Sequence, residues 1–277
     1  MSLDIVKIAG GAVAAEIVPE KGGICTRLTI GGEEILYLDP ATLDEDRETK
    51  VRGGIPILFP NPGRLTDDTY KLGSESFFLP QHGFARNLPW SLVKADASSV
   101  ELRLVSFHYT AEHFPFEFDI RVRYRCAGNT FTVEQTYANM GTQRPMPLHV
   151  GFHPYFLVPD ADKAATTIST DAGRAWDNVA KAEREFAGFD LTADELDLML
   201  RDHSSRETLI TRPGKRVIRM TWDAPFSQLV VWTQKGKDFV CVEPWTAAPD
   251  ALNTGEGLVH IGPRETRKTW FAITALE

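Results

Sequence analysis

The segment Phe118-Asp-Ile-Arg-Val-Arg-Tyr-Arg-Cys126 decides the fold class, because apolar and charged residues alternate along it. Successive side chains of a β-strand point to opposite faces, so this pattern predicts a strand with one buried and one exposed face. Gly128-Asn129 is a turn signal, and residues 130–137 are rich in β-branched and aromatic side chains. The whole stretch therefore predicts an antiparallel hairpin.

Strand signals of this kind dominate the chain. They cover residues 5–18 around Gly10-Gly11, 25–38 around Gly31-Gly32, 100–107, 216–222, 228–233, 239–242 and 269–275. Helical signals are few. We expect one short helix over residues 190–196, with Thr192 as its N-cap, and one turn at residues 111–114. Residues 160–200 show the weakest secondary-structure pattern, and we expect them to form a long excursion over one face of the sheets.

Many short strands without a linker between two halves predict an all-β sandwich or barrel that forms a single domain over residues 1–277. The net charge of −8 argues against nucleic acid or an anionic membrane as the main partner, although a local basic pocket for an anionic substrate is compatible with it. Cys25, Cys126 and Cys241 lie far apart, which favours three buried free thiols in a reducing compartment. With no signal-peptide pattern and no membrane-length apolar run, we expect a cytoplasmic protein.

The segment His149-Val-Gly-Phe-His-Pro-Tyr-Phe156 also alternates. In an extended strand His149, Gly151, His153 and Tyr155 would share one face, opposite an apolar face. Imidazole is the usual acid or base near neutral pH, so the pattern predicts a strand that lines a polar cleft.

Three further segments carry candidate functional residues. Residues 52–64 place arginines at both ends of a Gly- and Pro-rich stretch, which is either a rigid loop or a site for sugar hydroxyls or phosphate. In Gln81-His-Gly-Phe-Ala-Arg86, the residues His82, Phe84 and Arg86 would share a side if the chain were extended. A lone histidine is more often structural than catalytic, so the segment alone leaves both interpretations open.

The third segment, Cys241-Val-Glu-Pro-Trp-Thr246, ends an apolar strand with a carboxylate. Glu243 at that position must be paired, hydrogen-bonded or at a cleft. Trp245 lies on the same side, and an indole beside a carboxylate is a common platform for a sugar ring. A partly exposed glutamate beside a core tryptophan is the alternative.

Several motifs are missing from the sequence. His149 and His153 are four residues apart, but there is no His-Glu-x-x-His and no third ligand motif, so we expect no metal site. Phosphate-binding Gly-rich loops, the dinucleotide Gly-x-Gly-x-x-Gly and the Gly-x-Ser-x-Gly elbow are also missing, so we expect no cofactor.

Together, four motifs resemble the aldose 1-epimerase (galactose mutarotase-like) family, near its hexose-6-phosphate mutarotase branch. In chain order they are Arg-Gly-Gly-Ile-Pro at 52–56, Gln-His-Gly-Phe-Ala-Arg at 81–86, His-Pro-Tyr-Phe at 153–156 and Cys-Val-Glu-Pro-Trp at 241–245. The resemblance implies a large antiparallel β-sandwich with few short helices. It also implies interconversion of the α and β anomers of a sugar, without a cofactor.

Carried over by motif, Glu243 is the general base, His153 the general acid and His82 a second histidine that holds the ring oxygen. Arg52 and Arg86 match arginines that lie near the substrate in the phosphosugar branch. Asp197 is the best match to a sugar-binding aspartate, although its neighbours depart from the family pattern. Further substrate contacts are expected from Arg64, Tyr155 and Trp245, and the role of His149 stays open.

Two other functions compete with an aldohexose 1-epimerase. A glycoside hydrolase needs two carboxylates, and only Glu243 stands in a strong motif. A non-catalytic sugar-binding module would not need the base, the acid and the second histidine. Within the epimerase interpretation we favour an unphosphorylated hexose slightly over a hexose 6-phosphate, because the acidic chain offers an anion no general attraction.

Overall fold

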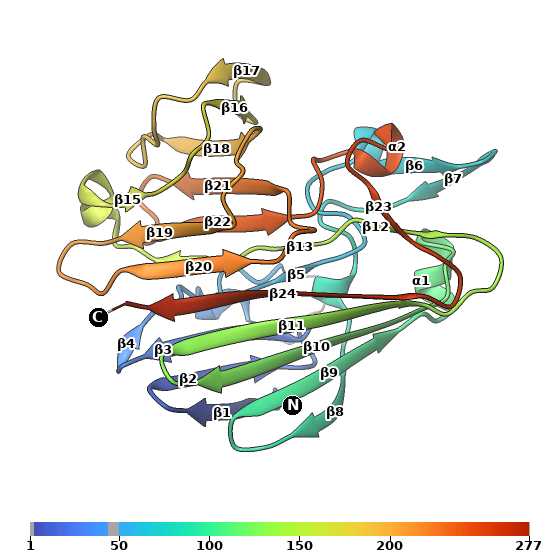
Figure 1. The fold of residues 1–277 in the computed structure, drawn as a ribbon, viewed down its shortest axis with the longest axis horizontal. Helices are drawn as coiled ribbons and strands as arrows, with labels where there is room; N and C mark the ends of the chain where they lie inside the picture. The colour runs from blue at the N-terminus through green and yellow to red at the C-terminus, as the bar shows by residue number, and fades with distance from the viewer. Residues whose placement is uncertain (1–2, 44–49, 277) are drawn as a thin grey trace.

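The predicted hairpin is present in the computed structural model of the protein, which describes residues 3–43 and 50–276. Strands β10 (Phe118–Ala127) and β11 (Thr130–Asn139) pair antiparallel, with Ala127 opposite Thr130. Gly128 in the turn has a φ of 57°, a left-handed conformation that glycine adopts without strain. This hairpin lies in the middle of a larger sheet (Figure 1).

Sheet I has eight antiparallel strands in the order β15-β19-β20-β24-β11-β10-β9-β8. Its other members are β15 (Thr167–Ile168), β19 (Glu207–Thr211), β20 (Ile218–Trp222), β24 (Thr266–Ala275), β9 (Ser99–Val105) and β8 (Ser91–Ala95). Strand β8 is an exposed edge, and its pairing with β9 shifts register between Leu92 and Lys94.

Sheet II follows the order β17-β16-β18-β21-β22-β13-β5, and β14 also pairs with β22. Its strands are β17 (Ala182–Glu185), β16 (Arg174–Asp177), β18 (Glu195–Leu200), β21 (Gln228–Gln234), β22 (Phe239–Trp245), β13 (Gly151–Phe152), β5 (Ile57–Leu58) and β14 (Tyr155–Leu157). In the view of Figure 1, strands β17, β16, β18 and β21 of sheet II lie above strands β24, β11, β10, β9 and β8 of sheet I.

Smaller elements complete the structure. The N-terminal sheet consists of β1 (Val6–Gly10), β2 (Val13–Val18), β3 (Ile24–Ile30) and β4 (Glu33–Glu34), and two-stranded sheets pair β6 (Thr69–Leu72) with β7 (Glu75–Phe78) and β12 (Met146–Leu148) with β23 (Val259–Ile261). The α-helices are α1 (His108–His113) and α2 (Ala251–Thr254), and short 3-10 turns occupy Pro40–Thr42, Thr66–Asp68, Ala85–Asn87 and Asp160–Ala165. Within the described residues no helix has the length and apolarity to cross a membrane.

The all-β prediction is confirmed, but the helix expected over residues 190–196 is wrong. Residues 191–194 form turns, and Glu195 already begins β18. Asp190 accepts hydrogen bonds from the backbone N–H and the hydroxyl of Thr192, so the polar side chains fix a turn and not a helix start. Residues 160–200 contribute four strands, two of which extend sheet II beside β18.

The alternation of each strand fills one hydrophobic core. Phe131, Val133 and Tyr137 of β11 are fully buried in this core, as are Val240 and Val242 of β22. The core also takes apolar side chains from the N-terminal sheet, which Tyr124 ties to β10 by donating to the Gly23 carbonyl at 2.7 Å. Because Val240 and Val242 face the core, the alternate residues of β22 face the other side of sheet II.

We expect Phe131→Ala to lower the free energy of unfolding by about 3–5 kcal/mol, because it leaves a cavity at a fully buried position. Leu92→Ala in β8, whose side chain is 53% exposed, is the control and should change it by about 0.5 kcal/mol or less. Chemical denaturation followed by circular dichroism measures both. Equal effects of the two substitutions would contradict the assigned core.

Candidate active site

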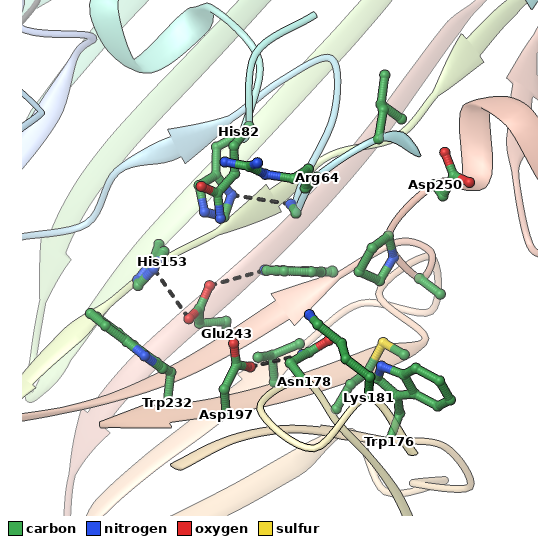
Figure 2. A pocket seen from close by; sticks show the side chains of 18 of the residues that line it. Arg64, His82, His153, Trp176, Asn178, Lys181, Asp197, Trp232, Glu243 and Asp250 are labelled. Atoms are coloured by element: carbon green, nitrogen blue, oxygen red, sulfur yellow. Dashed lines mark hydrogen bonds and ion pairs between the residues drawn. The ribbon is translucent and has the colours of Figure 1, made fainter. Parts of the chain in front are cut away.

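A cleft of about 880 Å³ opens on the face of sheet II that does not face the core (Figure 2). Alternate residues of three neighbouring strands form its floor: Asp197 and Met199 of β18, Val230 and Trp232 of β21, and Glu243 and Trp245 of β22. Loops form its walls. They contribute Lys50, Arg52, Arg64, His82 and Arg86 from the first third of the chain, and Asn178, Lys181, Pro249 and Asp250 from later segments.

Glu243 is a carboxylic acid held at a buried position, with only 1% of its surface exposed. The indole Nε1 of Trp245 donates a hydrogen bond to its Oε2 at 3.2 Å, and Nε2 of His153 lies 3.3 Å from its Oε1 (Figure 2). A buried carboxyl group needs such partners for its oxygens. The indole therefore fixes the orientation of the carboxyl group and leaves Oε1 to the imidazole.

The register of the strands explains why these two groups meet. Gly151 stands opposite Trp245, and Tyr155 stands opposite Cys241. The same antiparallel register places His153 opposite Glu243, although the interval between β13 and β14 interrupts the strand. Gly151 also makes room for the tryptophan, since a Cβ there would lie 2.5 Å from Trp245 Cδ1.

Burial controls the ionisation of this pair. It raises the pKa of the Glu243 carboxyl well above its ordinary value; the nearby Asp197 carboxylate adds to the rise, and Trp245 and Arg86 oppose it. Burial also lowers the pKa of the His153 imidazole, and Arg86 and Arg52 lower it further. Both shifts disfavour separated charges. Burial therefore favours a neutral carboxyl group beside a neutral imidazole, with one proton between them.

His82, in the wall of the cleft, lies close to the Glu243–His153 pair. Its ring centre lies 5.6 Å from that of His153, and its Nδ1 accepts a hydrogen bond from the Gly63 backbone N–H at 3.1 Å. Burial, followed by the charge of Arg86, lowers the pKa of His82 well below its ordinary value. A neutral ring whose Nδ1 accepts must carry its proton on Nε2, so His82 offers one N–H donor.

Arg52 and Arg86 lie beside the two histidines. Their charges lower the pKa of both imidazoles. The guanidinium of Arg52 lies 5.8 Å above the Trp232 ring, and Arg86 donates to the Val51 carbonyl at 3.2 Å. Arg64 is at the rim, 66% exposed and 3.7 Å from Asp68. The charges of Arg52 and Arg86 thus act on His153, whereas Arg64 lies near Asp68 on the wall of the cleft (Figure 2).

Asp197 is brought to the cleft floor near Glu243. Asn178 Nδ2 donates to its Oδ1 at 2.8 Å (Figure 2). Burial raises the pKa of the Asp197 carboxyl group. The negative charges of Glu195 and Asp177 raise it further, whereas Asn178 and Lys181 lower it. Asn178 and Lys181 are not predicted from the sequence, because they stand in the poorly patterned stretch before β18.

Two aromatic rings pack against His153 of the Glu243–His153 pair. Tyr155 stacks on His153 with ring centres 4.7 Å apart, and Trp232 stands edge-on to His153 at 5.6 Å. Trp232 was also missed, although the period of two in residues 228–233 places it on the same face as Val230. The rings and Trp245 give the cleft floor apolar surface beside its charged groups.

Two local expectations from the sequence are wrong. His149 does not share the cleft with His153: it is fully buried, and its Nε2 lies 3.2 Å from the Ala247 carbonyl, to which it donates. The chain passes from β12 to sheet II between Leu148 and Gly151, so the alternation does not continue across this step. Residues 82–86 are not extended either. His82 has a φ of 69° and a 3-10 turn begins at Ala85, so Phe84 enters the core while His82 and Arg86 line the cleft.

Comparison with known proteins gives concordant matches. The sequence model of the family described as aldose 1-epimerase matches residues 4–274. The crystal structure of the Slr1438 protein from Synechocystis sp. PCC 6803 is 34% identical, covers 100% of this chain and 97% of its own, and superimposes with a TM-score of 0.95. The crystal structure of a galactose mutarotase-like protein from Clostridium acetobutylicum is 20% identical and superimposes with a TM-score of 0.82. The match covers 100% of this chain and 96% of that protein's chain.

A protein of Cenchrus ciliaris named "Putative glucose-6-phosphate 1-epimerase" is 26% identical over 269 residues, which is 87% of this chain and 78% of that protein. The match to the family model extends over nearly the whole chain, from the N-terminal sheet through β22 and into β24. The cleft on sheet II, with its buried carboxyl group and imidazole, lies within the matched region. This chain therefore belongs to the aldose 1-epimerase family.

Proposed function

We propose that this isomerase interconverts the α and β anomers of an aldohexose pyranose, with Glu243 and His153 as its proton-transfer pair. The observation that carries the proposal is the 3.3 Å contact between Glu243 Oε1 and His153 Nε2 on the floor of the cleft. A hemiacetal has two oxygens bonded to the same carbon. Two groups in direct contact can therefore each reach one of these oxygens.

In the forward direction Glu243 takes the proton of the C1 hydroxyl and His153 gives a proton to the ring oxygen. The bond between C1 and the ring oxygen breaks, and C1 becomes an aldehyde carbon. Rotation about the C1–C2 bond then presents the other face of the aldehyde. On ring closure the former ring oxygen, now a hydroxyl group, returns its proton to His153 as it attacks C1, and Glu243 gives the proton that it holds to the carbonyl oxygen, which becomes the new C1 hydroxyl. The acid and base roles are thus reversed.

The pair needs only one proton for this cycle. This proton resides on the carboxyl group, because burial disfavours the charged forms of both partners. Moving it across the short contact gives carboxylate and imidazolium, the form in which Glu243 is the base and His153 the acid. Arg86 favours the ionised carboxylate, and substrate hydroxyl groups in the cleft would add hydrogen bonds to it.

The remaining groups hold the sugar. In this proposal His82 donates its Nε2–H to the ring oxygen, and Asp197 accepts a hydrogen bond from a sugar hydroxyl. Arg52, Arg86 and, at the rim, Arg64 offer hydrogen-bond donors, while Tyr155 and Trp245 offer ring faces for the C–H surface of the pyranose. No step of this chemistry calls for a cofactor.

One observation favours a hexose 6-phosphate as a second candidate substrate. Lys50, Arg52 and Arg86 all act on His82 as nearby positive charges, so three cations converge at one end of the cleft. Arg52 lies over an indole and Arg86 donates to a backbone carbonyl, and neither forms an ion pair with a carboxylate within residues 3–43 and 50–276. This end is thus suited to a phosphate group in spite of the net charge of −8.

We further propose that residues 1–277 act as a single cytoplasmic domain without a nucleic-acid partner. One hydrophobic core joins the N-terminal sheet, sheet I and sheet II. The free, buried state of Cys25, Cys126 and Cys241 is typical of a reducing compartment. The acidic net charge supports a small sugar, and not a nucleic acid, as partner.

We expect Glu243→Gln to lower the rate of anomer interconversion by about 10²–10⁴-fold, because the amide cannot accept the hydroxyl proton. Polarimetry of a freshly dissolved single anomer measures the rate, and circular dichroism checks the fold. Glu256→Gln, at the exposed mouth of the same cleft, is the matched control and should stay within a few-fold of wild type. Activity of Glu243→Gln close to that of the control would refute the assigned base.

The two histidines of the 149–153 segment should behave differently. His153→Asn is expected to lose about 10²–10⁴-fold in activity, since it removes the acid. His149→Asn is expected to lower the free energy of unfolding by about 1–3 kcal/mol, because it disturbs a buried hydrogen bond to Ala247, while the folded protein stays active. If His149→Asn were inactive and His153→Asn active, His149 and not His153 would be the proton donor.

Competition between glucose and glucose 6-phosphate decides between the candidate substrates. A phosphate site at Lys50, Arg52 and Arg86 should favour the phosphosugar by about tenfold or more, roughly 1.4 kcal/mol, and salt should reduce the preference. Arg52→Gln should abolish it, whereas Arg64→Gln at the rim should not. If both sugars compete equally at low salt, the unphosphorylated hexose is the substrate.

A further inference from the structure

One side chain beside the proton-transfer pair has no part in the proposed reaction. Cys241 precedes Glu243 by two residues on β22, so both side chains point to the same face of sheet II. Its thiol is free and fully buried, and Tyr155 and Trp232 stand opposite it on the two neighbouring strands. The cysteine therefore lies next to Glu243 and His153, although it does not itself line the cleft.

The three side chains form a compact set of donors. Sγ of Cys241, a ring nitrogen of His153 and a carboxyl oxygen of Glu243 all lie within 4.8 Å of one another. Thiolate, imidazole and carboxylate are the ligands that Zn²⁺ prefers, and three of them with one open position form a common zinc geometry. We propose that Zn²⁺ or a similarly soft divalent cation binds Cys241, His153 and Glu243 and inhibits the enzyme reversibly.

The distances are compatible with this ligand set. Donor atoms of a tetrahedral zinc site lie roughly 3.3–3.6 Å apart, given ordinary Zn–N, Zn–O and Zn–S bond lengths. The contact of 3.3 Å between His153 Nε2 and Glu243 Oε1 already has this spacing. The thiol has to approach the pair by at most about 1.2 Å, which a change of side-chain torsion angles can supply. His153 and Glu243 line the cleft, so the cation has a route from solvent and an open position for water.

The charged groups around the site act on a divalent cation in opposite directions. The carboxylates of Glu243 and Asp197 attract it, and Asp197 lies close enough to affect the ionisation of Glu243. Arg52 and Arg86 repel it, so binding depends on the thiolate as third ligand. On binding, the thiol and the Glu243–His153 pair each release one proton, and zinc affinity should rise with pH.

Inhibition is expected because the cation would bind the same atoms of Glu243 and His153 that transfer protons. The inhibition rests on the proposed roles of Glu243 and His153, whereas the binding of the cation does not. Magnesium prefers oxygen ligands and octahedral geometry, so it should neither bind nor inhibit at this site.

The experiment compares wild type, Cys241→Ala and Cys126→Ala, a matched control whose thiol is buried in β10. Each protein is treated with a chelator, assayed for anomer interconversion, and then titrated with zinc chloride. We expect zinc to inhibit wild type and Cys126→Ala, the chelator to restore activity, and Mg²⁺ to have no effect. Cys241→Ala should keep its basal activity and require at least about ten times more zinc for inhibition, a loss of roughly 1.4 kcal/mol.

Cadmium chloride provides a readout that is independent of activity. It should give thiolate-to-metal charge-transfer absorption in wild type and Cys126→Ala, and none in Cys241→Ala. Saturating sugar should weaken this signal in wild type, which keeps the test valid if Cys241→Ala does not fold. Equal zinc inhibition of Cys241→Ala and wild type, or no thiolate absorption in wild type, would overturn the proposal. A chelated wild-type enzyme that is inactive but gives the absorption would refute the proposed function and not the metal site.

Discussion

The direct contact between the buried side chains of Glu243 and His153 is the constraint around which the cleft is built. Each group has been removed from water, so each needs a partner, and each is the partner of the other. The contact depends on the pairing of β22 with β13 and β14, which the core side of the same strand stabilises through Val240 and Val242. The fold thus fixes the Glu243–His153 pair through backbone register and not through loops.

The loops supply what the strands do not. Positive charge reaches the pair from the segments before β5 and after β7, as Arg52 and Arg86, while the amide of Asn178 comes from the turn after β16. The floor of the cleft is therefore formed by paired strands, and its walls are formed by loops from different parts of the chain. Substrate preference can change through the walls while the chemistry on the floor stays the same.

Much of this arrangement could be predicted from the sequence. The alternation in residues 118–137 gave the hairpin, and the same periodicity put Glu243 and Trp245 on one side of their strand. Both predictions concern residues within one regular strand or hairpin, where a period of two applies. The roles assigned to the site residues were carried over from a family resemblance and stay predictions until they are tested.

The failures occur where regular structure ends. His149 was placed in the cleft because the alternation was extended across a change of sheet, and the helix at residues 190–196 was inferred from a cap that in fact fixes a turn. Trp232, Asn178 and Lys181 were missed because they join the site only through pairing between strands distant in sequence. Local patterns carry no information on such pairings.

The backbone of His82 has a consequence for substrate binding. Its left-handed conformation, with a φ of 69°, is costly for a residue other than glycine, by about 1–3 kcal/mol. Two reciprocal bonds with Gly63 offset that cost: the His82 N–H donates to the Gly63 carbonyl at 2.8 Å, and the Gly63 N–H donates to the imidazole. The imidazole is thus preorganised during folding, in both orientation and tautomer. A sugar that enters the cleft need not spend binding energy on ordering this side chain, and more of that energy is available to distinguish the transition state from the closed ring.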